Sequence, residues 1–201
     1  LEKLLRSREP EVQRAAVAAR GGIADPAALA LLRKLAGSRD PAIALAAIHG
    51  LARWAKEDAK VAAELLHDLE GSNVDRKIAA ADALGEGGVA SSAGAIVRLL
   101  DHREWRVRAS AILNLRRLRA REAIEPLIGR IEKEEGRLQD DVIDALEDLT
   151  GQSFGFSPAN WQGWWRVNGP GFVVPPPRDP KAPPPADEGG TSSGYYGIRV
   201  N

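Results

Sequence analysis

A repeat of about 31 residues, a length typical of helical-hairpin arrays, runs through most of the chain and limits its fold more than any other feature. The anchors of successive repeats follow one another at intervals of 31, 33, 31 and 31: Val12, Ile43, Arg76, Val107 and Leu138. Four residues after each anchor is a column of small residues: Ala16, Ala47, Ala80, Ala111 and Val142. Two apolar columns follow, five and eight residues after the anchors: Val17, Ile48, Ala81, Ile112 and Ile143, then Arg20, Leu51, Leu84, Leu115 and Leu146. Such periodicity is typical of repeat proteins, whose neighbouring units share one core.

Each repeat is predicted to contain two helices. The first helices are expected to start, three residues before each anchor, at a capping residue: Glu9, Asp40, Asn73, Glu104 and Glu135. The second helices have apolar residues at spacings 0, 3, 4 and 7: Ala28, Leu31, Leu32 and Leu35; Ala62, Leu65, Leu66 and Leu69; Ala93, Ile96, Val97 and Leu100; Ile124, Leu127, Ile128 and Ile131. These spacings place four side chains on one face of a helix. Each unit is therefore helix, turn, helix.

Two stretches carry a resemblance to a known family: "VQRAAVAARGGIADPAALALLRKL" and "RKIAAADALGEGG". They resemble HEAT repeats of the short bacterial kind, also called phycobilisome-lyase-like repeats. The resemblance implies an all-α fold, a right-handed α-solenoid of about five helical hairpins over residues 1–167. Members of this class serve as scaffolds, adaptors, regulatory subunits, bilin lyases and DNA-repair glycosylases, so the fold alone leaves several functions open.

A tryptophan-rich segment, "LTGQSFGFSPANWQGWWRVN", follows the last repeat. Ser157 and Pro158 can start a helix, and Trp161, Trp164 and Trp165 then fall on one face. We expect a C-terminal capping helix that covers the open end of the core. The alternative is an aromatic site for a ligand or for bases.

Residues 168–194 are predicted to be a linker rich in Pro and Gly, with eight prolines between Pro170 and Pro185. Such a tail favours extended polyproline conformations. Phe172, Val173 and Val174 are candidates to lie along the solenoid. A polyproline ligand for an adaptor domain, through Pro177 and Pro180, is the alternative.

Residues 195–201 are predicted to start another, truncated domain. This join resembles bacterial proteins in which a HEAT array precedes a von Willebrand factor A domain, on these residues: Tyr195, Tyr196, Gly197, Ile198 and Val200. The D-x-S-x-S metal signature of that domain is absent here, so the resemblance implies no metal site. The chain also begins at Leu1 inside an apolar helical pattern and contains no Met, which predicts a piece of a longer protein.

Composition excludes several classes of function. Lys and Arg together number 28, as do Asp and Glu, which disfavours a nonspecific nucleic-acid binder. No apolar run reaches the roughly 18 residues of a membrane span. Cysteine is absent, so no thiol chemistry is expected and the redox compartment stays open. His49, His67 and His102 fall in different helices, and no nucleotide-binding loop occurs, so we predict no catalytic residue, metal or cofactor.

Two stretches of opposite charge lie next to each other. Residues 103–121 contain seven arginines against one acid, and residues 132–148 contain eight acids. One interpretation is complementary packing between neighbouring repeats, with exposed pairs contributing about 0 to 1 kcal/mol each. The others are a dipolar surface that orients a charged partner, and nucleic-acid binding with Trp105 available for stacking.

The sequence therefore predicts a noncatalytic protein–protein interaction scaffold or adaptor module of a larger protein. A protein or peptide partner is expected to lie along the surface of the second helices. The candidate contact residues there interrupt the apolar faces: Lys34, Glu64, His67, Arg98 and Arg130. The alternative function is a bilin-lyase-like or nucleic-acid-processing enzyme, which needs a pocket with convergent polar groups.

Overall fold

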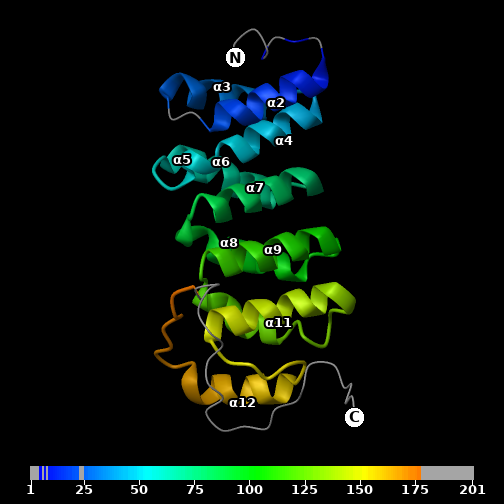
Figure 1. Ribbon diagram of the computed structural model, residues 1–201, viewed down its shortest axis with the longest axis vertical. Helices are drawn as coiled ribbons and strands as arrows, with labels where there is room; N and C mark the ends of the chain where they lie inside the picture. Colours follow the sequence, from blue (N-terminus) through cyan, green and yellow to red (C-terminus); the bar gives the residue numbers. More distant parts are fainter. Residues whose placement is uncertain (1–4, 6, 8, 23–24, 178–201) are drawn as a thin grey trace, which may run out of the picture.

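The computed structural model describes residues 5, 7, 9–22 and 25–177, and in them the helices form two layers (Figure 1). The first helices of the five units lie one below the other in the front layer: α2 (Pro10–Gly21), α4 (Pro41–Gly50) with the short α5 (Ala52–Ala55), α7 (Val74–Glu86), α9 (Trp105–Arg117) and α11 (Gly136–Thr150). Each packs on the first helix of the next unit. The prediction of an all-α solenoid of about five hairpins is confirmed.

The second helices form the other layer: α3 (Pro26–Ala36), α6 (Ala59–Glu70), α8 (Ala93–Val97), α10 (Ile124–Ile128) and α12 (Pro158–Asn168). Two of them are shorter than predicted, because α8 lies between the 3-10 turns η1 (Ala90–Ser92) and η2 (Arg98–Asp101), and η3 (Arg121–Ala123) precedes α10. Pro126 has no N–H to donate, so it is tolerated only in the first turn of α10. The apolar residues predicted for these two helices are nevertheless buried, or half-buried at Val97.

One continuous core runs between the layers. The small-residue column is almost inaccessible, with Ala47, Ala80 and Ala111 each 0% exposed. Helices α2 and α4 come even closer at glycines, since a Cβ on Gly21 would lie 2.7 Å from the Cα atom of Gly50. The repeat register is therefore maintained by backbones that only small side chains allow to approach.

The predicted capping residues do precede the first helices, but only some of them cap. The Asp40 carboxylate accepts from the Ala42 N–H at 2.9 Å, and Asn73 accepts from the Arg76 N–H at 3.0 Å. The side chains of the three glutamates make no such bond: Glu9, Glu104 and Glu135. The prediction that each unit opens with a side-chain cap is thus wrong for glutamate, whose longer side chain is not among the preferred N-caps.

The tryptophan helix α12 closes the array, as expected. Ser157 accepts from the Asn160 N–H at 3.4 Å and starts the helix, which packs on α10. Trp161 is fully buried, donates from Nε1 to the Gly155 carbonyl at 2.8 Å and meets the ring of Phe154 edge-on at 5.0 Å. Residues 169–177, here called the arm, then turn back along the array, the orange segment in Figure 1. Residues 195–201 and the remainder of the predicted linker lie outside the described residues.

The turn that contacts the arm contains a strained residue. Gly88 follows the first helix of the third unit with a φ of 68°, and Arg119, at the equivalent position of the fourth unit, adopts a φ of 54°. Among the described residues Arg119 is the sole non-glycine with positive φ. Its guanidinium forms an ion pair with the Asp148 carboxylate at 2.9 Å and donates to the Pro175 carbonyl at 2.6 Å. The side chain thus provides contacts that accompany an unfavourable backbone conformation.

We predict that Ala80→Leu overpacks the contact between first helices and lowers the free energy of unfolding by about 1 to 3 kcal/mol. Ala30→Leu is the matched control, because Ala30 is exposed on α3 and its change should stay within about 0.5 kcal/mol. Urea unfolding followed by circular dichroism measures both. Equal stability of the two variants would contradict the proposed register.

Arg119→Gly and Arg119→Ala separate backbone strain from side-chain contacts. Both variants lose the ion pair with Asp148, but glycine adopts the left-handed conformation without strain, so Arg119→Gly should be about 1 kcal/mol more stable than Arg119→Ala. Gly88→Ala, at the equivalent turn, should lose a similar amount relative to the unmodified chain. The same unfolding assay applies, and identical values for the two Arg119 variants would exclude strain at this position.

Candidate functional site

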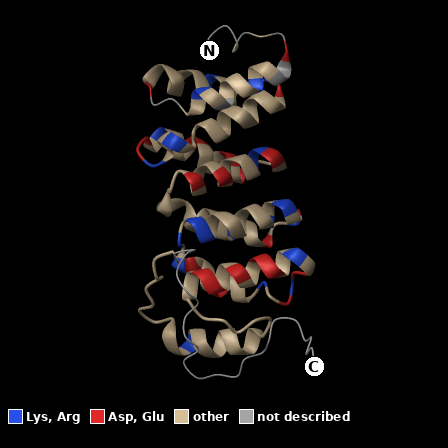
Figure 2. Cartoon of the chain, in the orientation of Figure 1, with Lys and Arg blue, Asp and Glu red and all other residues tan. Residues whose placement is uncertain are grey.

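Several ion pairs join equivalent regions of neighbouring units. Three hydrogen-bonded pairs join residues 31 positions apart: Arg33 with Glu64, Arg106 with Asp75 and Arg117 with Glu86. Because this separation is the length of one repeat, such residues face each other across the contact between units. Figure 2 shows the result as positive and negative patches on successive helices, with α11 largely acidic.

Most arginines of residues 103–121 bind acidic side chains or main-chain carbonyls of the chain itself. Arg116 bonds Asp148 at 3.0 Å, Arg108 bonds Glu134 at 2.8 Å, and Arg121 donates to the Phe172 carbonyl at 2.9 Å. Six of the seven arginines have such contacts; within the described residues the side chain of Arg103 has none. These contacts favour the packing interpretation over nucleic-acid binding, although Trp105 is 60% exposed.

The surface of the second helices contains a cleft of about 420 Å³ between α3 and α6. Apolar side chains form part of its lining, including Ile48, Leu51 and Leu65, while Arg33 and Glu64 pair at its rim. Arg76 reaches in from α7, bonds Asp68 at 2.8 Å and donates to the Ala36 carbonyl at 2.7 Å. The cleft is thus partly apolar, and its charged groups are fixed by contacts between three successive units.

Four of the five predicted contact residues are exposed on this surface. Lys34, His67 and Arg98 occupy equivalent positions in the first three units, each one repeat after the last. His67 and Glu64 also line the cleft. Lys34 and His67 make no side-chain hydrogen bond or ion pair in the described part of the chain, whereas Glu64 pairs with Arg33 and Arg98 lies 4.0 Å from Glu70.

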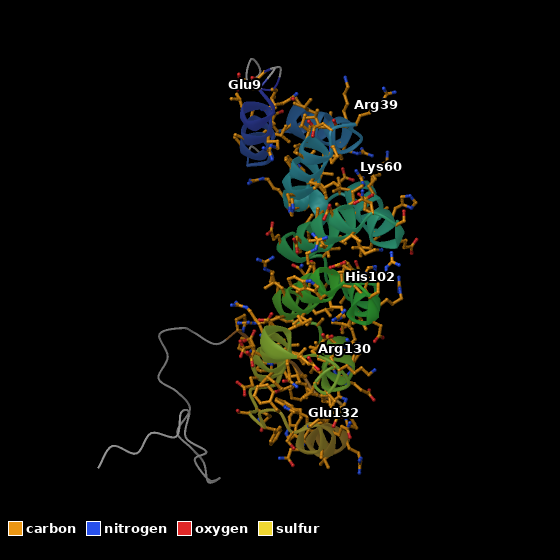
Figure 3. All side chains as sticks on the ribbon, turned by 90° about the vertical axis from the view of Figure 1, so that its right-hand side faces the viewer. Glu9, Arg39, Lys60, His102, Arg130 and Glu132 are labelled. Carbon is orange, nitrogen blue, oxygen red and sulfur yellow. The ribbon has the colours of Figure 1, made fainter. Side chains whose placement is uncertain are left out.

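The fifth predicted residue, Arg130, differs from the expected exposed contact. Figure 3 turns the array to its edge and labels Arg130 in the second-helix layer. Its side chain is only 12% exposed and bonds both Glu134 and Asp101, the latter at 3.0 Å. Arg108 also holds Glu134, through two bonds of 2.8 Å. Arg130 therefore belongs to a buried charge network, and the prediction of its exposure is wrong because the fold after α10 turns it inward.

Glu134 is the centre of this network and is 4% exposed. Burial alone would raise the pKa of Glu134, but the hydrogen bonds from Arg108 and Arg130 outweigh burial and hold the pKa below its usual range. A carboxyl group whose pKa is lowered by folding stabilises the fold above its unfolded pKa of about 4.3. That stabilisation is lost as the pH falls through the folded-state pKa.

We predict that Glu134→Gln lowers the free energy of unfolding at pH 7 by about 3 kcal/mol, because Arg108 and Arg130, both largely buried, lose the carboxylate that they share. Below about pH 4.3 the unmodified chain should lose stability more steeply than the variant, since only the unmodified chain takes up the proton at this position. Unfolding curves between pH 7 and 3 measure both effects. Glu122→Gln, at an exposed position, should follow the unmodified profile; parallel curves for Glu134→Gln would contradict the role of the network.

No group of three or more potential ligands that could hold a metal ion occurs in residues 9–22 and 25–177 or at positions 5 and 7. His49 and His67 are exposed, and the Nδ1 atom of His102 accepts from the Glu104 N–H at 3.0 Å. Within the same described range no helix is both long and apolar enough to cross a membrane.

Several residues of this surface escape prediction from the sequence. Arg33 and Arg76 arrange the cleft, but in the sequence they stand out only as parts of the repeat pattern. The pairing of Arg33 with Glu64 could be found from their separation by one repeat and their opposite charge. The contact of Arg76 with a helix-terminal carbonyl carries no comparable signal in the sequence.

Comparison with known proteins supports the fold. The sequence profile of the family described as HEAT repeats matches residues 1–74 and 61–147. The crystal structure of an engineered protein from a structural genomics consortium is similar, with a TM-score of 0.51 and 22% sequence identity. This similarity covers 72% of the present chain and 76% of the engineered one. At that identity the likeness concerns the fold alone. A search of curated proteins found no match.

Proposed function

Because the chain belongs to the HEAT-repeat family, whose members generally serve as protein-interaction scaffolds, we propose that it is a noncatalytic interaction module. Its partner is a protein segment that lies along the second helices. The observation that carries this proposal is the row of exposed basic or imidazole side chains at equivalent positions of three successive units, Lys34, His67 and Arg98. The middle residue, His67, lines the cleft between α3 and α6.

The geometry of the row favours an extended segment with acidic side chains. Packed helices lie roughly 8 to 10 Å apart, and an extended chain of the polyproline type has three residues per turn and advances about 3.1 Å per residue. Every third residue of such a segment would therefore meet the next unit. Lys34 and Arg98 supply positive charge at two steps, and His67 supplies a hydrogen-bonding ring between them.

The alternative, a bilin-lyase-like or nucleic-acid-processing enzyme, requires polar groups that converge on a substrate. The charged side chains of the cleft instead form ion pairs with one another, Arg33 with Glu64 and Arg76 with Asp68. This engagement supports the scaffold proposal. Colour uptake on mixing with a bilin pigment would favour the enzyme instead.

The test uses a synthetic twelve-residue peptide with Glu at every third position and fluorescence anisotropy at physiological salt. The triple variant Lys34→Ala, His67→Ala, Arg98→Ala should bind it at least about tenfold more weakly, since about 1.4 kcal/mol corresponds to a factor of ten. Melting temperature should not change, because these side chains are exposed.

A matched control removes the same three residue types elsewhere: His49→Ala, Arg53→Ala, Lys56→Ala, all exposed near α5. It should retain the affinity of the unmodified chain. An equal loss of affinity in both variants would show that only net charge matters, which would contradict the proposed site. An unchanged affinity in the first variant would contradict it as well.

A further inference from the structure

The far end of the array holds a peptide, the chain's own arm. Arg121 donates from Nε to the Phe172 carbonyl at 2.9 Å and from Nη2 to the Gly169 carbonyl. Arg119 donates to the Pro175 carbonyl at 2.6 Å and also to the Asp148 carbonyl at 2.8 Å. Two arginines from one turn of the fourth unit thus bind three main-chain oxygens of the arm.

Aromatic side chains hold the arm beside these arginines. The ring of Phe172 meets Trp164 at 5.3 Å and Trp165 at 5.7 Å, both nearly edge-on. The guanidinium of Arg121 lies 5.5 Å from the centre of the Trp165 ring. Val174 also packs against the core, whereas Val173 between them is 82% exposed. The arm is therefore anchored by one aromatic and one aliphatic side chain, with solvent on its other face.

The contacts define the chemical class of peptide that fits. Main-chain carbonyls are common to every residue, so the arginines select the course of the backbone and not a particular side chain. Residues 169–172 form a turn in which the Phe172 N–H donates to the Gly169 carbonyl at 3.0 Å, and residues 172–177 continue without helix or turn. In a polyproline helix, which has three residues per turn, carbonyls three residues apart lie on one edge. The carbonyls of Phe172 and Pro175 have this spacing, and Pro175 through Pro177 favour such a conformation.

We propose that the turn at Arg119 and Arg121, with Trp164 and Trp165, is a binding site for extended proline-rich peptides with one aromatic anchor. Residues 169–177 are its resident ligand. The site lies on the last two units and does not depend on the proposed function of the second-helix row. A covalently attached ligand acts at an effective concentration of about millimolar, so the arm excludes a second peptide of this class until it is weakened or displaced.

The experiment measures binding of a fluorescent peptide with the sequence of residues 168–177, NGPGFVVPPP, to the full chain. The unmodified chain should bind it weakly, because the arm competes. Phe172→Ala removes the anchor of the arm but leaves the site intact, so the affinity should rise at least tenfold. Gly171→Ala weakens the arm independently, since Gly171 has a φ of 76° and an added Cβ would touch nothing within 4 Å.

Controls separate the site from the arm. Adding Arg121→Ala to Phe172→Ala should abolish the gain, and a probe with alanine in place of its phenylalanine should bind none of the proteins. Circular dichroism verifies that each variant keeps its helix content. If neither arm variant binds the peptide more tightly than the unmodified chain does, the proposal is wrong. It is equally wrong if Arg121→Ala leaves the gain unchanged.

Discussion

The close contact between successive first helices is the constraint on which the other interactions of this array depend. Fully buried alanines lie where α4, α7 and α9 contact one another, and two glycines allow α2 and α4 to approach closely. A larger side chain at these positions would change the distance and angle between units. Because the same contact recurs once in every repeat, each position faces its own equivalent in the next unit.

The charge pattern follows from this geometry. Once equivalent positions face each other, an acid in one unit and an arginine one repeat later become neighbours, as in Asp75 with Arg106 and Glu86 with Arg117. These exposed pairs contribute little stability individually. Glu134 differs because it is buried between Arg108 and Arg130, where an uncompensated charge would be costly. The opposite charges of neighbouring stretches therefore belong mainly to the assembly of the array, which leaves the second-helix row as the more informative surface for a partner.

The sequence is sufficient for features that depend on local patterns and insufficient for features that tertiary packing decides. The columns at Ala80 and Leu84, the helix starts and the cap at Trp161 can be predicted because each depends on local periodicity or on adjacent residues. The shortened α8 and α10 cannot, because tertiary packing decides how far a short helix extends. Helical periodicity predicts Arg130 on the surface, but the helix ends at Ile128 and the periodicity no longer applies. That Lys34, His67 and Arg98 contact a partner stays a prediction, which binding measurements test.

The turn that contacts the arm differs in sequence from the equivalent turn of the preceding unit. The turn of the third unit needs only the left-handed backbone that Gly88 provides without strain. The fourth unit keeps the same turn, because the repeat packing determines its course, yet has arginine there. Its side chain reaches Asp148 of the last unit and the arm beyond it, contacts that glycine could not make. Among the described residues, this unfavourable conformation therefore occurs only at Arg119, whose side chain connects the helical units to the arm. That coincidence is the reason to regard the arm and its arginines as a built site rather than as incidental contacts of a linker.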